Sequence, residues 1–244
     1  MKKFYFLTTF LLIIAVIPSL AQTDGSNQKN TWYIGVGGNL NSSWIIDQNT
    51  YGEPNLNAMF TPGFAGNLNV GVDFDDYLGL KMELGYAFMG QKYNGTQYDS
   101  TVARTIKLTY IVLPVMLKFR TGGKVTKFYL MAGPELEILL SASQSYLRDG
   151  VDAPLYSPPL NRGTIDVSKK DITDRYSPIS GCARLDLGIE ITPSKHFMMD
   201  IGLSNFFSIT DLNRPSYRII ENNGRYWISH DFYSGLNVGL NYVF

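Results

Sequence analysis

The sequence predicts an all-β protein whose strands close into an antiparallel, up-and-down transmembrane β-barrel, with eight strands favoured and ten as the alternative. Three observations carry this prediction. Apolar and polar residues alternate along long segments, short and long connections alternate between these segments, and the final segment ends on an aromatic residue, Phe244. Alternation with a period of two indicates strands with one apolar face. Many of the segments reach the about 9–11 residues that a membrane-spanning strand needs.

The N-terminus predicts a secretory signal peptide over residues 1–21. Two lysines precede an apolar run over residues 4–17, and Ser19 and Ala21 supply the small residues of a cleavage site after Ala21. The run is short for a transmembrane helix, which needs about 20 apolar residues. No later segment is long and apolar enough for such a helix, so the outer-membrane β-barrel domain, residues 22–244, would cross the membrane with strands.

The composition argues against a nucleic-acid partner. The chain has 21 basic and 21 acidic residues, and the signal peptide removes two lysines and no acid, which leaves 19 against 21 and a net charge of −2. A nucleic-acid-binding protein is expected to carry a basic patch instead. The single cysteine, Cys182, excludes an internal disulfide, and we expect it to be a small packed side chain within a strand.

The first three predicted strands show the alternation most simply. Residues 32–41 and 63–73 put aliphatic and aromatic side chains at alternate positions, with mainly glycine, alanine and asparagine between them. Residues 78–90 alternate leucine, methionine and aromatic residues with glycine, alanine, Lys81 and Glu83. Turn residues bound each segment, as expected for separate strands.

The next two predicted strands, residues 105–120 and 127–141, each contain a proline. A closed barrel has no edge at which Pro114 and Pro134 would escape the loss of a hydrogen-bond donor. A turn near residues 122–124 brings the two prolines nearly opposite each other on one face, so we expect a shared bulge there. This register favours as lipid-facing side chains Leu108, Tyr110, Val112 and Met116.

The last three predicted strands are residues 182–192, 197–209 and 229–244. The first of them is the most regular, because aliphatic residues alternate with charged residues and a glycine. The final strand should pair across the seam with residues 32–41. Its end resembles the C-terminal signal that hands bacterial outer-membrane barrels to their insertion machinery, which makes that machinery an expected partner. The residues of this insertion signal are Asn237, Gly239, Tyr242 and Phe244.

The polar faces of these strands carry charges of both signs. Eight strands enclose an interior just wide enough for side chains to fill, so charges inside would have to pair with one another. The alternative is the solvated face of a soluble sheet. The predicted interior ionic plug, which has a structural role, consists of Lys81, Glu83, Glu135, Glu137, Arg184, Asp186 and Glu190.

The connections give an independent argument for a barrel. They are short at residues 74–77, 121–126 and 193–196, and long at residues 42–62, 91–104, 142–181 and 210–228. Outer-membrane barrels have short periplasmic turns and longer external loops, which puts both termini in the periplasm when the strand number is even. Ten strands would require a further hairpin around residues 156–167, within the connection of residues 142–181.

Two segments carry a resemblance to a known family. Residues 110–119, YIVLPVMLKF, are followed by residues 128–134, FYLMAGP, and this hairpin resembles the central hairpin of the PorT-like outer-membrane β-barrel family of the Bacteroidetes group. Residues 200–205, DIGLSN, are similar to a segment of its penultimate strand. The resemblance implies a barrel of about eight strands in the bacterial outer membrane. It implies no single activity, since some relatives assist gliding or type IX secretion and most have no assigned role.

The first functional hypothesis is a non-enzymatic integral outer-membrane protein, structural or accessory to an envelope or secretion assembly, with outer-membrane lipid around it and external loops for contact. The connection of residues 142–181 is the candidate for an envelope partner, because prolines and tyrosines alternate in it. A narrow channel or a binder of a small ligand is an alternative, although paired interior charges count against a pore.

The second functional hypothesis is an enzyme that modifies outer-membrane lipid. Such an enzyme needs a nucleophile, a base and a carboxylate within reach of one another. Ser229, His230 and Asp231 are adjacent, but alternation points His230 away from the other two, and only a partner such as Ser208 or Ser43 would reach it. We predict no catalytic, cofactor-binding or metal-ligating residue.

Overall fold

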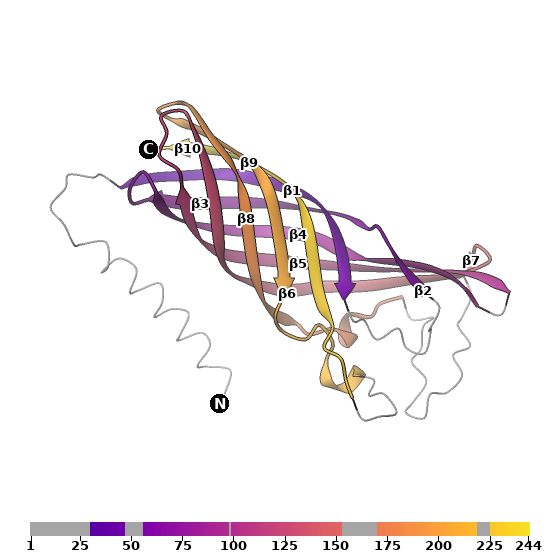
Figure 1. Cartoon of the computed structure of the whole chain (residues 1–244). Helices are drawn as coiled ribbons and strands as arrows, with labels where there is room; N and C mark the ends of the chain where they lie inside the picture. Colours follow the sequence, from indigo (N-terminus) through magenta and orange to yellow (C-terminus); the bar gives the residue numbers. More distant parts are fainter. Residues whose placement is uncertain (1–29, 47–55, 98, 153–169, 219–224) are drawn as a thin grey trace, which may run out of the picture.

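In the computed structural model, residues 30–46, 56–97, 99–152, 170–218 and 225–244 are described. These residues form one antiparallel sheet that closes into a ring (Figure 1). Among them, no helix is long and apolar enough to cross a membrane. The predicted signal peptide, residues 1–21, lies outside the described residues, as does the possible additional hairpin at residues 156–167.

Within the described part of the chain, eight strands pair in a closed ring, each with its neighbours in chain order. Two short strands attach to this ring, β2 (Leu56–Met59) to β4 and β7 (Val151–Asp152) to β6. Two short 3-10 helices, Thr173–Arg175 and Pro215–Tyr217, lie in the connections. The ring consists of β1 (Thr31–Ile46), β3 (Pro62–Asp73), β4 (Leu78–Gln97), β5 (Ser100–Arg120), β6 (Thr126–Arg148), β8 (Ile179–Ser194), β9 (Phe197–Ser208) and β10 (His230–Val243).

The seam between β10 and β1 confirms the predicted closure. Tyr33 pairs with Val243, and the Phe244 amide donates a hydrogen bond to the Trp32 carbonyl oxygen at 2.9 Å. Because β10 pairs directly with β1, the ring closes with eight strands and the ten-stranded alternative is wrong. The start of β1 and the end of β10 lie together at one end of the barrel, called here the terminal end, and the opposite end is the loop end (Figure 1).

Alternate side chains point to opposite faces of the wall, as the period of two predicts. On β1 the side chains of Trp32, Ile34 and Val36 are each more than half exposed, whereas Tyr33 between them is 1% exposed. The same contrast holds along β4, where Leu84 is 52% exposed and Glu83 is 5% exposed. In the half of the barrel nearer the terminal end, the wall is therefore apolar outside and largely polar inside. This is the arrangement of a β-barrel that crosses a bilayer.

Strands β4, β5 and β6 are longer than the sequence predicted. Their expected limits were residues 90, 105 and 141, but pairing continues to the hairpin end at Gln97 and Ser100, and to Arg148 on β6. The expected loop of residues 91–104 is thus mostly a paired hairpin that extends well past β8, β9 and β10 (Figure 1). The apolar pattern ends early because the outward face becomes polar while the inward face stays buried.

The predicted proline bulge is wrong. Pro114 pairs with Glu135 and points into the barrel, whereas Pro134 is exposed on the outside. The register is unchanged past both prolines, and the irregularity lies between Thr109 and Tyr110. Since the centre of β5 is apolar on both faces, alternation could not identify its inner side. The side chains expected to face lipid are instead 0 to 6% exposed inside the barrel: Leu108, Tyr110, Val112 and Met116.

An apolar core fills the interior toward the loop end. Aromatic side chains from several strands meet there, and Phe206 stacks on Tyr233 with ring centroids 4.8 Å apart. Ile172, Tyr176 and Leu212 from the connections complete this core, and each is 0 to 1% exposed. The connections therefore fold back over the loop end of the barrel and bury apolar side chains within it.

Candidate functional site

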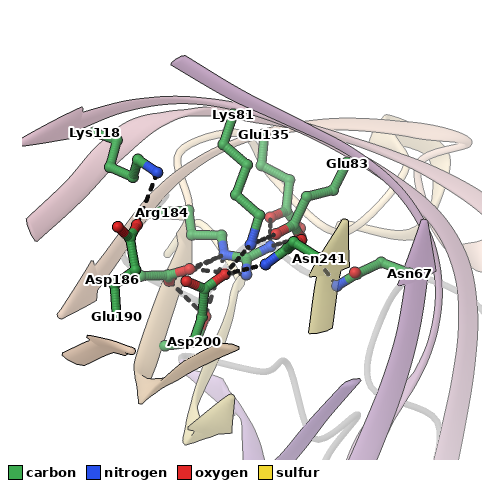
Figure 2. A network of polar contacts seen from close by, with 11 residues as sticks. Asn67, Lys81, Glu83, Lys118, Glu135, Arg184, Asp186, Glu190, Asp200 and Asn241 are labelled. Carbon is green, nitrogen blue, oxygen red and sulfur yellow. Dashed lines mark hydrogen bonds and ion pairs between the residues drawn. The ribbon is translucent and has the colours of Figure 1, made fainter. Parts of the chain in front are cut away.

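The candidate site is a network of buried charges in the barrel interior, on the terminal-end side of the apolar core (Figure 2). Alternation places these side chains inside, because each occupies an inward position of a strand with an apolar outward face. Among the described residues, the ion pairs that make up this network join four cations to six carboxylates. The members are Lys81, Lys118, Arg120, Arg184, Asp73, Glu83, Glu135, Asp186, Glu190 and Asp200.

Arg184 on β8 is the centre of the network. Its Nη1 lies 2.9 Å from Oε2 of Glu83 on β4 and 3.4 Å from Oε2 of Glu135 on β6. Its Nη2 and Nε contact the Asp186 carboxylate at 2.9 and 3.0 Å, and Nε also contacts Ser204 Oγ at 3.1 Å. A guanidinium with several fixed donors suits this position, because it can satisfy carboxylates from several strands at once.

Lys81 extends the network to the far wall. Its Nζ lies 3.1 Å from Glu83 Oε1 on the same strand and 3.6 Å from Asp200 Oδ2 on β9. Two amides satisfy further carboxylate oxygens, since Asn67 donates to Glu83 at 3.1 Å and Asn241 donates to Asp200 at 2.9 Å. Figure 2 shows these side chains converging from opposite walls of the barrel.

A second group of charges lies nearer the terminal end. Lys118 Nζ is 2.8 Å from Asp73 Oδ1 and 3.0 Å from Glu190 Oε2. Arg120 Nη1 binds the same two carboxylates at 2.7 and 2.9 Å. The Tyr33 ring of β1 lies 4.5 Å from the Lys118 ammonium, so every strand of the ring contributes to the network or touches it. This group borders a polar cleft of about 310 Å³ at the terminal end.

Six of the seven residues expected to form the ionic plug belong to the network. The seventh, Glu137, is fully buried but has no ion pair among the described residues, and its Oε2 accepts a weak hydrogen bond from Cys182 Sγ at 3.5 Å. Cys182 is buried within a strand, as expected. The structural role of the plug stays a prediction.

Sequence reasoning missed four members of the network: Asp73, Lys118, Arg120 and Asp200. Asp200 could have been found, because it shares the polar face of its strand with Gly202 and Ser204. Lys118 and Arg120 follow the segment of β5 that is apolar on both faces, so only the register of that strand reveals which way they point.

The histidine triplet does not form a triad. His230 Nδ1 contacts the backbone carbonyl oxygen of Ser208 at 2.7 Å, while Ser208 Oγ accepts from the Asp231 amide at 2.8 Å. Asp231 is buried inside and accepts from the Tyr110 hydroxyl at 3.0 Å. Ser43 Oγ donates to the Gly90 carbonyl oxygen. No serine hydroxyl is therefore bonded to the His230 ring within the described contacts.

A polar cluster around Asp211 orders the connection before β10. The Asp211 carboxylate accepts from the Tyr226 hydroxyl at 2.9 and 3.0 Å, from the Ser229 amide at 3.3 Å and from Arg218 Nε at 2.7 Å. Partial burial raises the pKa of Tyr226 above its usual value of 10.0, which keeps its hydroxyl available as a donor. Asn213 links this cluster to the Ser229 side chain at 2.8 Å.

The connection of residues 142–181 is only partly available for contact. Residues 153–169 lie outside the described residues. Tyr146 belongs to β6, and both Tyr146 and Tyr176 are buried in the barrel, at 4% and 1% exposure. Any contact surface of this connection therefore excludes these two tyrosines.

The four residues of the expected insertion signal divide between the two faces of β10. Asn237 and Gly239 point inward and are buried, whereas Tyr242 and Phe244 are 50% and 72% exposed on the outside. The two exposed rings contact each other edge to face, with centroids 5.3 Å apart. Their role in insertion stays a prediction. In the part of the chain that is described, no group of three or more metal-ligating side chains is placed to hold a metal ion.

The ion pairs of the network join side chains from separate strands of the barrel wall. In a dry interior, an ion pair is strong only if its remaining donors and acceptors are satisfied, and removing one partner leaves an uncompensated charge. Here most carboxylates accept from two or more donors, so the charges stabilise one another across the barrel. These contacts are those expected of the predicted structural role.

The family model that matches this chain agrees with the observed architecture. Residues 20–214 match a family model described as "Outer membrane protein beta-barrel domain". No curated protein matches the chain in sequence. Similar solved structures include Ail of Yersinia pestis, at 12% identity. The alignment covers 88% of this chain and 99% of that chain, with a TM-score of 0.43. OprG of Pseudomonas aeruginosa is similar at 10% identity, with 89% of this chain and 97% of that chain covered and a TM-score of 0.42.

Neisserial surface protein A is similar at 11% identity, with 86% of this chain and 96% of that chain covered and a TM-score of 0.43. The match to the family model spans most of the chain, including the strands from β1 to β9 and all ten members of the charged network. This protein therefore belongs to the outer membrane protein β-barrel domain family and is an integral protein of the bacterial outer membrane.

Proposed function

We propose that this protein is a non-enzymatic outer-membrane barrel, structural or accessory to an envelope or secretion assembly, that contacts its partner through the elements at its loop end. The filled interior is the observation that carries the proposal. Ion pairs join opposite walls in one half, and an apolar core closed by Ile172, Tyr176 and Leu212 fills the other. A scaffold with such an interior fits a contact role better than transport.

The orientation and the narrower family assignment are part of the same proposal. The first residues of β1 and the last residues of β10 lie at the terminal end, next to the short turns. We therefore place the terminal end in the periplasm and the long β4–β5 hairpin outside the cell. The resemblance of residues 110–134 supports a PorT-like protein of the Bacteroidetes group. The sequence of β10 supports recognition by the insertion machinery.

The surfaces proposed for partner contact are the hairpin and the connection of residues 142–181. Tyr93 pairs with Arg104, so replacing residues 94–103 by Asn-Gly shortens the hairpin while keeping a two-residue turn. A second variant lacks residues 153–169. Affinity purification from native membranes should recover a defined set of envelope proteins with the wild type. At least one shortened variant should lose that set.

Two results would contradict this proposal. The wild type purifying without envelope proteins, even after chemical cross-linking, would contradict the assembly role. Recovery of the same set with both shortened variants would contradict contact through the loop end. Heat-modifiable gel mobility of each variant is the control for folding, because a folded barrel migrates differently before and after boiling.

A further inference from the structure

The outward face of β4, β5 and β6 changes from apolar to polar toward the loop end. On β4 the outward side chains of Leu84, Tyr86 and Phe88 are 52%, 44% and 37% exposed and continue the apolar band of the barrel. Beyond Phe88 the outward positions are polar, apart from Gly90, Ala103 and Leu147. These polar side chains belong to Lys92, Asn94, Thr96, Thr101, Thr105, Lys107, Ser143 and Ser145.

The pairing arranges the first polar positions in rows across the three strands. Phe88 lies opposite Thr109, which lies opposite Ser141. The next row is Gly90, Lys107 and Ser143, and the row after it is Lys92, Thr105 and Ser145. Lys92 and Lys107 therefore lie in consecutive rows on neighbouring strands. Both lie on the loop-end side of Phe88, which is the last aromatic residue of the apolar band.

The two lysines are close enough to bind one group together. Diagonal neighbours on adjacent antiparallel strands are separated by about 7–8 Å, and a lysine side chain is long enough for both ammonium groups to converge. Gly90 lets the backbones of β4 and β5 approach closely beside Lys107, because a Cβ atom at this position would meet the Ile106 carbonyl oxygen. The hydroxyl groups of Thr105 and Ser143 lie directly across from Lys92 and Lys107 and add hydrogen-bond donors.

The local charge is positive and uncompensated within the described residues. Lys92 and Lys107 are exposed, and neither forms an ion pair there, whereas the interior lysines Lys81 and Lys118 each contact two carboxylates. The nearest acid by pairing on this side is Asp171, which bridges to Ser143 and whose Oδ1 accepts a hydrogen bond from the Thr173 amide. An anion with several acceptor oxygens fits these donors.

The position relative to the apolar band identifies the source of that anion. Lys107 lies one row beyond Phe88, so about 7 Å separates the level of the last lipid-facing ring from the first lysine. Aromatic side chains mark the boundary between the hydrocarbon region and the headgroups. A lipid whose acyl chains lie against Leu84, Tyr86 and Phe88 would present its headgroup at the level of the lysines.

We propose that Lys92 and Lys107, with the hydroxyl groups of Thr105, Ser143 and Ser145, bind the phosphate of a phosphorylated glycolipid in the outer leaflet of the outer membrane. This inference rests on the proposed orientation, in which the loop end faces outward. The β4–β6 face thereby holds a lipid headgroup next to the surface proposed for partner contact.

The test compares two charge-matched variants of the full mature protein in detergent. K92Q/K107Q removes both lysines of the proposed site, and K124Q/K195Q removes two exposed lysines at the terminal end. Native mass spectrometry with diphosphorylated lipid A and with its dephosphorylated form measures binding. The wild type and K124Q/K195Q should bind the phosphorylated form about ten-fold more tightly than the dephosphorylated form, and K92Q/K107Q should lose most of this preference.

Three results would overturn the inference: equal binding of the two lipids by the wild type, an unchanged preference in K92Q/K107Q, or an equal loss in K124Q/K195Q. Folding of each variant is checked by heat-modifiable mobility. The orientation is tested separately with a T101C variant, which a membrane-impermeant maleimide should label on intact cells. Lack of labelling in a folded variant would contradict both the orientation and the outer-leaflet lipid, whereas labelling without phosphate preference contradicts the lipid site alone.

Discussion

Arg184 on β8 contacts Glu83 on β4 across the interior of the barrel, with 2.9 Å between Nη1 and Oε2. The two strands are not neighbours in the ring, so this ion pair joins separate parts of the wall. Both side chains are buried, at 4% exposure for Arg184 and 1% for Glu83. Ion pairs of this kind make the stability of the barrel depend on charges that no single hairpin contains.

Replacing Arg184 by methionine should destabilise the barrel strongly. The change leaves Glu83, Glu135 and Asp186 without their shared cation, and breaking a buried pair typically costs about 3–5 kcal/mol. Urea unfolding in detergent or bilayers measures the loss. Lys127→Met is the matched control, because its partner Asp76 is 70% exposed in its side chain and such pairs contribute about 0–1 kcal/mol. Similar losses for both variants would contradict the structural role of the network.

The purified barrel should not conduct ions steadily in planar bilayers. The charged network and the apolar core fill successive parts of the interior, so ions find no continuous hydrated path. Single-channel recordings of the refolded protein measure this directly, and an open porin in the same bilayers shows that the assay detects pores. Stable conductance steps from the folded wild type would favour the channel alternative.

Phe244→Ala should reduce insertion into the outer membrane of cells but leave refolding in detergent nearly unchanged. The Phe244 ring is 72% exposed and contacts only Tyr242 among the ring contacts of the described residues, so its loss removes little packing. Phe197→Ala, which removes another outward aromatic side chain near the terminal end, is the control. Equal insertion of the wild type and Phe244→Ala in membrane fractions would disprove the predicted signal.

Neither the wild type nor His230→Ala should modify lipids. The His230 ring bonds to the backbone of Ser208 and stacks on Phe207 at 4.8 Å, and no nucleophile contacts it within the described residues. Incubation of purified protein with phospholipid and lipid A vesicles, followed by mass spectrometry of the lipids, measures modification. Product formed by the wild type and abolished in His230→Ala would support the enzyme alternative.

Asp211→Asn should loosen the connection before β10 while the barrel stays intact. The carboxylate joins Tyr226, Ser229 and Arg218, and hydrogen bonds to a charged group typically contribute about 1.5–3 kcal/mol each. Limited proteolysis of detergent-solubilised protein should cut this connection faster than in the wild type, without a change in heat-modifiable mobility. Asp76→Asn, at an exposed turn of the terminal end, is the control, and equal cutting rates in the wild type and Asp211→Asn would refute the ordering role.

Alternation predicted the number of strands, the seam and most inward charges, because strand geometry fixes which face a residue takes. Alternation failed where the two faces of a strand do not differ in polarity as an apolar outward face and a polar inward face would. The centre of β5 is apolar on both sides, so Pro114 and Tyr110 were assigned to the wrong face. The outer parts of β4 and β5 have a polar outward face, so the pairing of residues 91–97 with residues 100–106 was missed.

Contacts between distant strands were beyond prediction for a different reason. The sequence places Lys81 and Asp200 on inward faces, but which charges meet depends on the stagger of the closed ring. The 3.6 Å contact between these two side chains follows only from the combined registers of several strand pairs. These pairs are β4 with β3 and β5, and β9 with β8 and β10. Alternation along the sequence tells which side of the barrel wall a side chain faces. It does not tell how far along the barrel axis that side chain lies.

The bond from the Phe244 amide to the Trp32 carbonyl has a consequence for the order of assembly. The first and last strands of the ring are partners, so the wall cannot be complete before β10 has emerged and docked. Arg184 and Asp186 bind carboxylate and hydroxyl partners from three other strands, and those contacts need the full curvature of the closed ring. A barrel stalled one strand short would therefore expose unpaired charges to its surroundings, and such an intermediate would be a ready substrate for periplasmic proteases and chaperones.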